Sequence, residues 1–125
     1  MIDAGTACTV DFVSDGEHQG GYIFPGLSLA RSSLTLRTAR IGGVADRLYS
    51  AKLEPGRNTQ QAVEHGIRMS LVSMCERALH NASSSIDAVI VTGGDGDWLA
   101  GHLPDHVIVQ PNLVFLGIHR FFRGL

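Results

Sequence analysis

The chain has 125 residues, 44% of them hydrophobic, which is enough for one domain with a single modest core. Its formal net charge is -2 and its lysines and arginines are spread along the chain, so the composition favours neither a nucleic-acid partner nor contact with a membrane surface. Cys8 and Cys75 match no disulfide or metal pattern, which is typical of a reducing compartment. With no secretory signal and no apolar run of membrane-spanning length, we expect a cytoplasmic protein.

The first eleven residues bring a carboxylate, a glycine and a hydroxyl close together. Asp3, Gly5 and Thr6 form a predicted turn that leads into an alternating strand, in which Thr9 and Asp11 share one face. Glycine permits close backbone approach, the amides and the hydroxyl donate hydrogen bonds, and a carboxylate can hold a cation. The stretch predicts half of a phosphate site. Ordinary turn chemistry is the competing explanation, and the polar face that continues along the strand weakens it.

Hydrophobic periodicity predicts the other elements and an α/β fold. Strands are expected at residues 7–13, 20–24, 86–91 and 107–109, with an Asp-Gly hairpin turn between the first two. Helices are expected at residues 27–39, 59–81, 98–103 and 112–122, with a short additional helix at 44–50 as an option inside a surface loop. Asn58 or Thr59 is the predicted cap of the long helix and Asn112 that of the last helix, and Arg31 is expected outside the apolar stripe of its helix.

A second glycine turn follows the predicted strand at residues 86–91. Gly93 and Gly94 stand where α/β folds bind ligands, and they would let a phosphate or a flat ring lie against the backbone. A tight turn with Asp95 or Asp97 as a helix cap explains the same residues equally well. No Walker or dinucleotide motif is present.

The histidines and possible nucleophiles predict no catalytic centre of their own. His102 and His106 are separated by Pro104, so they do not share a helical face, and no third ligand lies nearby in the sequence. No serine or cysteine has the context of a nucleophile. We therefore expect no histidine metal site and no nucleophilic catalysis.

Several stretches together resemble the type III pantothenate kinases and the related Bvg accessory factor proteins. They are residues 3–11, 18–26, 58–59, 92–95 and 113–117, in this order and at these spacings. The pair D-x-G-T-A-x-T-x-D and G-G-Y-I-x-P-G is the most specific part. The resemblance implies an RNase H-like half of an actin-like ATPase fold of the sugar kinase and Hsp70 type. It also implies transfer of the ATP γ-phosphate to pantothenate, the first step of coenzyme A synthesis.

The resemblance also implies roles for individual residues. Asp3 corresponds to the ligand of a monovalent cation, potassium or ammonium, and Thr59 to a pantothenate contact. ATP contacts are implied at Gly5, Thr6, Gly93 and Gly94. Mg²⁺ is the expected companion of ATP, and the implied assembly is a homodimer. The long helix at 59–81 is the candidate contact, although its apolar stripe is equally well explained as core.

The chain departs from the family in one respect. Members carry an earlier half with a first phosphate loop, D-x-G-N-[ST], and a G-x-D-R segment whose aspartate accepts the proton, and neither motif occurs here. We therefore expect residues 1–125 to form one domain, the second lobe of a two-lobed kinase, with no catalytic base of its own. Asp11 is not a substitute, because nothing places it near the pantothenate hydroxyl.

The missing first half has two expected consequences, and two alternative functions stay open. Alone, the chain is expected to be inactive and to self-associate through a strand edge of the hairpin that the missing half would cover. One alternative is a non-catalytic regulatory protein of the same fold, like the Bvg accessory factors. The other is a kinase of the same superfamily that acts on a different small molecule, such as a sugar.

Overall fold

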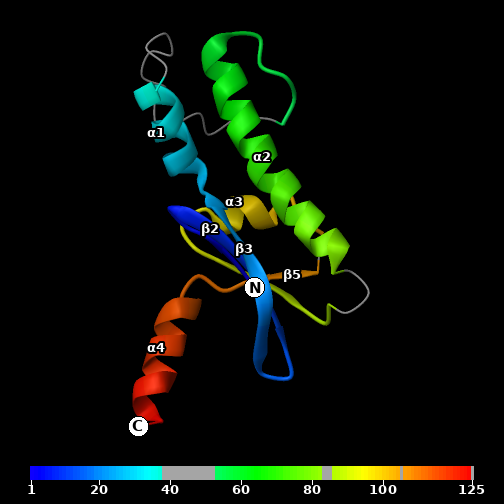
Figure 1. The fold of residues 1–125 in the computed structure, drawn as a ribbon, viewed down its shortest axis with the longest axis vertical. Helices are drawn as coiled ribbons and strands as arrows, with labels where there is room; N and C mark the ends of the chain where they lie inside the picture. Colours follow the sequence, from blue (N-terminus) through cyan, green and yellow to red (C-terminus); the bar gives the residue numbers. More distant parts are fainter. Residues whose placement is uncertain (38–52, 83–85, 105, 125) are drawn as a thin grey trace.

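The computed structural model describes residues 1–37, 53–82, 86–104 and 106–124. Within these ranges a mixed sheet of five strands has the order β3-β2-β1-β4-β5 (Figure 1). The strands are β1 (Ile2–Ala4), β2 (Ala7–Ser14), β3 (Glu17–Pro25), β4 (Val89–Thr92) and β5 (Val107–Val109). The helices are α1 (Leu27–Arg37), α2 (Thr59–Asn81), α3 (Gly96–Ala100) and α4 (Leu113–Arg123). The α/β class is confirmed, and the optional helix at 44–50 lies outside the described residues.

The hairpin of β2 and β3 forms as predicted. Asp15 and Gly16 have φ angles of 52° and 78°, the left-handed conformation that a tight Asp-Gly hairpin turn requires. The strands pair from Ser14 with Glu17 onward, so β3 begins three residues before the predicted strand. β3 is an edge strand of the described sheet, which leaves the prediction of self-association through this edge open to experiment.

The prediction of a turn at residues 3–6 was wrong in its first half. Ile2–Ala4 is the strand β1, which lies at the centre of the sheet, antiparallel to β2 and parallel to β4. Asp3 is therefore a strand residue, paired with Thr9 on one side and Thr92 on the other, and the turn itself is confined to Gly5 and Thr6. Three residues are too few to show a period, so sequence patterning could not reveal this strand.

One face of the sheet is buried against the helices. Strand residues at alternate positions pack with α2 and α3 into a single hydrophobic core that includes Ile2, Cys8, Val10, Val91, Leu71, Cys75 and Leu99. Cys8 and Cys75 are both buried as free cysteines. The hydrogen bond between the Cys8 and Cys75 thiols, together with burial, raises the pKa of Cys8, so this thiol stays protonated.

A buried ion cluster joins three helices and was not predicted. Glu64 of α2 is fully buried and accepts hydrogen bonds from Arg31 of α1, at 2.9 Å from Nε and 2.5 Å from Nη2. Arg68 lies 3.3 Å from the same carboxylate, and its guanidinium covers the Trp98 ring of α3 at 4.8 Å from the centroid. Burial alone would raise the pKa of Glu64, but the hydrogen bonds and charges of the two arginines hold it below its usual value. Arg31, which was expected outside the apolar stripe of its helix, is nevertheless largely buried, because its guanidinium pairs with Glu64.

Candidate functional site

Two turns meet at one edge of the sheet. Because β1 and β4 are parallel, their carboxyl ends lie side by side. The first turn, Gly5 and Thr6, follows β1, and the second turn, residues 93–95, follows β4. The amide of Asp95 donates a 3.0 Å hydrogen bond to the carbonyl of Ala4, which ties one turn to the other. Residues almost ninety positions apart in the sequence therefore form one local structure.

The two glycines of the second turn have different structural roles. Gly93 has a φ angle of +94°, and a Cβ there would lie 2.6 Å from both the Ala4 carbonyl oxygen and Asp3 Oδ1. Only glycine fits at this position, because any side chain would push the second turn away from Asp3. A Cβ at Gly94 would meet nothing within 4 Å. Gly93 thus holds the two turns together, whereas the space beside Gly94 is open to a ligand.

A third segment closes the first turn from the other side. Gly26, between β3 and α1, donates a 2.9 Å hydrogen bond from its amide to the Thr6 carbonyl. A Cβ on Gly26 would collide with the carbonyl oxygens of Gly5 and Thr6, so this position also requires glycine. The sequence indicated only that Pro25 and Gly26 end a strand. Their packing against a turn twenty residues earlier is a tertiary contact without a local signal.

The groups that a ligand could contact at this edge are a hydroxyl, a carboxylate, and backbone carbonyls and amides. Thr6 is exposed, and its hydroxyl makes no hydrogen bond to the described part of the chain. Asp3 is half-buried, with its carboxylate beside the second turn. A carboxylate and backbone carbonyls are hard donors, which suit an alkali or alkaline-earth cation and not a zinc ion. No group of three or more His, Cys, Asp or Glu residues that could hold a metal ion occurs in the described ranges.

The competing explanation of the second turn, a helix cap, has limited support. Asp95 occupies the N-cap position of α3, but its side chain makes no capping hydrogen bond. Asp97 lies in the first turn of this helix, where a carboxylate is favourable. His102 Nδ1 lies 2.9 Å from the carbonyl oxygen of Trp98, and the His102 ring lies tilted against the Trp98 ring. Both are structural contacts within the same segment.

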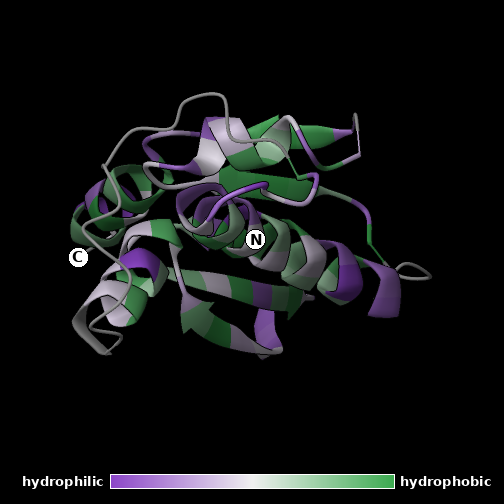
Figure 2. Ribbon diagram, turned by 90° about the horizontal axis from the view of Figure 1, so that it is seen from above, coloured by the Kyte–Doolittle hydropathy of each residue, from purple (hydrophilic) through white to green (hydrophobic). Residues whose placement is uncertain are grey.

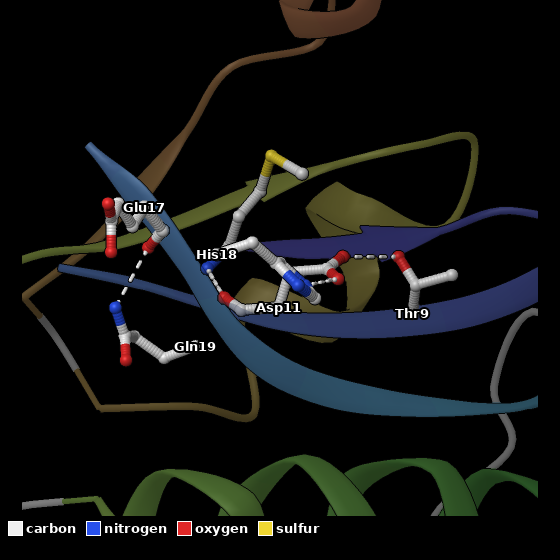
Figure 3. Close-up of polar contacts among 6 residues, drawn as sticks. Thr9, Asp11, Glu17, His18 and Gln19 are labelled. Atoms are coloured by element: carbon white, nitrogen blue, oxygen red, sulfur yellow. Dashed lines mark hydrogen bonds and ion pairs between the residues drawn. The ribbon is translucent and has the colours of Figure 1, made fainter.

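Thr9 and Asp11 share one face of β2, as predicted, and their contacts are shown in Figure 3. The Thr9 hydroxyl donates to Asp11 Oδ2 at 3.2 Å, and His18 Nε2 of β3 donates to Asp11 Oδ1 at 2.9 Å (Figure 3). Both carboxylate oxygens are therefore engaged within the hairpin. Asp11 thus links β2 to β3 through His18.

Thr59 lies in a different place from the two turns. It is the first residue of α2, directly after Asn58, whose side-chain oxygen accepts a 2.9 Å hydrogen bond from the Gln61 amide, as predicted for a cap. Thr59 lines a groove of about 690 Å³ between α1, α2 and the end of β3. The other lining residues are mostly apolar: Phe24, Pro25, Ala30, Leu34, Ala62, Val63, Gly66, Ile67, Ser70, Leu71 and Met74. Because they come from three elements, sequence reasoning missed the groove.

The groove and the first turn are nevertheless neighbours in the fold. Pro25 lines the groove, and the next residue, Gly26, donates its amide to Thr6. The segment that ends β3 therefore separates a potential acceptor site at Thr59 from a potential phosphate site at Thr6. Such a layout can position two substrates on either side of one short backbone segment.

Comparison with known proteins gives consistent results. The sequence profile of the family described as type III pantothenate kinase matches residues 1–81. A type III pantothenate kinase from Ectopseudomonas mendocina is 42% identical over 94% of this chain and 50% of its own length. One from Acinetobacter baylyi is 37% identical over 98% of this chain and 49% of its own length.

A solved structure shares the fold. It is a conserved protein from Campylobacter jejuni assigned to the Baf family of transcriptional activators, with a TM-score of 0.71 and 25% identity, and the match covers 98% of this chain and 56% of that one. The chain thus spans about half the length of the curated relatives that it matches. Because the family profile matches well over half of its residues, the chain belongs to the type III pantothenate kinase family.

Proposed function

We propose that this chain supplies the nucleotide- and cation-binding half of a kinase that transfers the ATP γ-phosphate to pantothenate, giving 4'-phosphopantothenate. The observation that carries the proposal is the meeting of the first and second turns at the carboxyl ends of β1 and β4. The sheet order β3-β2-β1-β4-β5, with antiparallel pairing on one side and parallel pairing on the other, supports an RNase H-like half of an actin-like fold.

At the phosphate site each residue has a distinct proposed task. Thr6 donates its hydroxyl and the Gly5 backbone approaches closely, so that both orient the phosphate chain. Gly94 leaves space for the nucleotide and Gly93 keeps that space beside Asp3. Asp3 and nearby carbonyls would hold the monovalent cation, which, with Mg²⁺ on ATP, supplies charge neutralisation when bound.

The acceptor site is proposed at Thr59. Its hydroxyl lies at the start of α2, where the first amides of a helix favour an anionic group such as the pantothenate carboxylate. The apolar groove beside it suits the methyl-bearing carbon skeleton of pantothenate. The proton acceptor and the first phosphate loop would come from the other half of the kinase, and we propose that the complete enzyme is a cytoplasmic homodimer.

The test is a kinase assay on a joined protein, in which this chain replaces the matching half of the Ectopseudomonas mendocina kinase. Asp3→Asn and Thr6→Val should each lower kcat/KM about 100-fold, because each removes a contact that stabilises charge in the transition state. Asp3→Asn should also remove the activation by potassium. Asp15→Asn, in the exposed hairpin turn, is the matched control. Unchanged rates for both site variants would contradict the assignment.

A second candidate function is regulatory, and the fold of the Campylobacter jejuni protein favours it. In this case the chain would keep the fold without transferring phosphate. Calorimetric titration of the 125-residue chain with ATP and with pantothenate separates the two functions. A stable fold that binds neither ligand at millimolar concentration supports the regulatory function, and binding of ATP supports the kinase.

A further inference from the structure

Helix α4 has no partner within the described structure. None of its residues is buried, and it extends away from the sheet and the other helices (Figure 1). Phe115, Phe121 and Phe122 are 72%, 65% and 68% exposed. Large aromatic side chains at this exposure are unusual for a soluble domain, and several of them on one helix indicate a surface that another structure covers.

Most of the exposed apolar residues of α4 lie on one side of the helix, whereas Leu116 lies on the opposite side. At 100° per residue, a sector of about 120° contains the following side chains: Val114, Phe115, Ile118, Phe121 and Phe122. We call this the α4 face. His119, Arg120 and Arg123 lie outside the sector, so the helix is amphipathic with a basic rim. Figure 2 shows hydrophobic residues on α4, which lies apart from the central strands.

The start of α4 is fixed beside the candidate site. β5 runs parallel to β4 and ends at the same edge of the sheet. The Gln110 amide then donates a 2.8 Å hydrogen bond to Val91, and the buried Thr92 hydroxyl donates to the Pro111 carbonyl at 3.3 Å. Thr92 directly precedes Gly93. Whatever covers the α4 face therefore also lies close to the two turns.

Exposed apolar side chains also lie on the face of the sheet that carries Asp3. Ile23 pairs with Thr9, which in turn pairs with Asp3, so the three side chains share one face. Ile23 is 80% exposed, and Ile108 of β5, on the same face, is 53% exposed. The core elements α1, α2 and α3 pack on the opposite face. Among the described helices, α1, α2 and α3 thus leave the side that carries Asp3 uncovered.

We propose that the α4 face is the docking surface for the other half of a type III pantothenate kinase, so that this half closes over Asp3 and Thr6. This rests on the proposed function. The relatives contain about as much polypeptide again as this chain matches, which is a folded unit large enough to cover both exposed surfaces. It would supply the groups that phosphoryl transfer still lacks here.

A second copy of this chain fits the α4 face less well. With 11 residues, α4 is only about 16 Å long. A stable homodimer interface buries roughly 800 Å² on each partner, more than one side of so short a helix offers. A membrane surface also fits less well, because the start of α4 is held at the site edge and a bilayer would block access to the two turns.

Hydrogen exchange of the α4 amides tests the proposal in the absence of ATP and pantothenate. The 125-residue chain alone is compared with the joined protein defined above. We expect exchange at residues 113–123 to be at least about tenfold slower in the joined protein. The double variant Phe115→Ser and Phe122→Ser should restore fast exchange, whereas Met69→Ser, which is also exposed but lies on α2, should not.

A second measurement keeps the proposal falsifiable if joining the halves disturbs folding. The unmatched part of the Ectopseudomonas mendocina kinase is made separately and titrated into the 125-residue chain, where it should slow α4 exchange at saturation. If α4 exchanges equally fast in both formats, the proposal is overturned. Slowing that depends only on the concentration of the 125-residue chain would identify a second copy instead. Slowing only by vesicles with anionic phosphatidylglycerol would identify a membrane.

Hydrogen exchange of α4 tests the docking proposal, and phosphate transfer tests the proposed kinase function separately. Protection of α4 in a joined protein that transfers no phosphate would support docking and contradict the kinase function. Activity with a fully exposed α4 would support the kinase function and contradict docking.

Discussion

Helices α2 and α4 have similar sequence signals but opposite environments. Each follows an asparagine, and each carries an apolar stripe with basic residues beside it. In α2 the stripe is buried against the sheet through Ile67, Leu71 and Cys75. In α4 no residue is buried. The difference shows that a hydrophobic stripe indicates that a helix face is to be covered, but not which part of the protein covers it.

A buried polar residue of α2 adds to the difference between the two helices. The buried side of α2 includes Glu64, whose charge is matched by Arg31 and Arg68 from two helices. Such a cluster can form only where surrounding elements bring the partners into place. α2 therefore contributes to stability through specific tertiary contacts, whereas α4 contributes little to the stability of this chain.

The largest effect is expected for Glu64→Ala. It removes the carboxylate that both guanidinium groups contact and should lower the free energy of unfolding by about 3–5 kcal/mol. Urea unfolding followed by circular dichroism measures this change. Glu76→Ala, on the exposed side of α2, is the control and should change stability by less than about 0.5 kcal/mol. Equal effects for the two variants would contradict the role of the cluster.

A matched pair of core and surface truncations compares the two helices directly. Leu71→Ala in α2 should cost about 2–5 kcal/mol, because it leaves a cavity in the core. Phe122→Ala in α4 should change stability by no more than about 0.5 kcal/mol, although it removes a larger side chain. Thermal unfolding of the 125-residue chain is the measurement. A large loss for Phe122→Ala would show that α4 already packs within this chain.

The ion cluster also predicts a pH dependence. The pKa of Glu64 in the folded chain lies below its ordinary value of 4.5, so its contribution to stability is complete above that pH. It is lost as the pH falls below 4.5 and through the folded pKa, because the folded state must then take up a proton that the unfolded state already holds. Urea midpoints between pH 7 and pH 3 should fall less steeply in Glu64→Gln than in the natural sequence. Parallel curves would argue against this linkage.

The smallest effect concerns the two asparagines. Asn58→Ala removes a cap hydrogen bond and should destabilise the chain by about 1 kcal/mol. Asn112 occupies the N-cap position of α4, as predicted, but its side chain makes no capping hydrogen bond. Asn112→Ala should therefore be nearly neutral. Chemical unfolding of both variants measures the difference between their losses of stability. Similar losses for the two variants would contradict this prediction.

The sequence predicted most of the elements because their signals are local. The alternation of β2, the Asp15-Gly16 turn and the long stripe of α2 each depend on neighbouring residues, and each is confirmed. The boundaries of β4 and α3 differ from the predictions by up to three residues, since Thr92 still pairs in the sheet and α3 begins at Gly96. These ends are decided by pairing and packing, not by composition.

The candidate site was only partly predictable. The motifs around Asp3, Thr6 and Gly93 indicated the family, which the family profile over residues 1–81 confirms. That Asp3 lies in a strand, and that Gly93 and Gly26 enclose the first turn, could not be read from the sequence. These contacts join segments far apart in the chain, and the space that allows them is defined only in three dimensions.

By itself, then, the sequence determined most of the secondary structure, the hairpin and the membership in a kinase family. Local periodicity, turn residues and motif spacing carry this information along the chain. The tertiary structure alone decided that Glu64 pairs with Arg31, that Thr59 opens onto a groove, and that α4 lies exposed beside the site. The physical reason is that burial and ion pairing depend on which distant segments meet, and a pattern within one segment does not specify its partner.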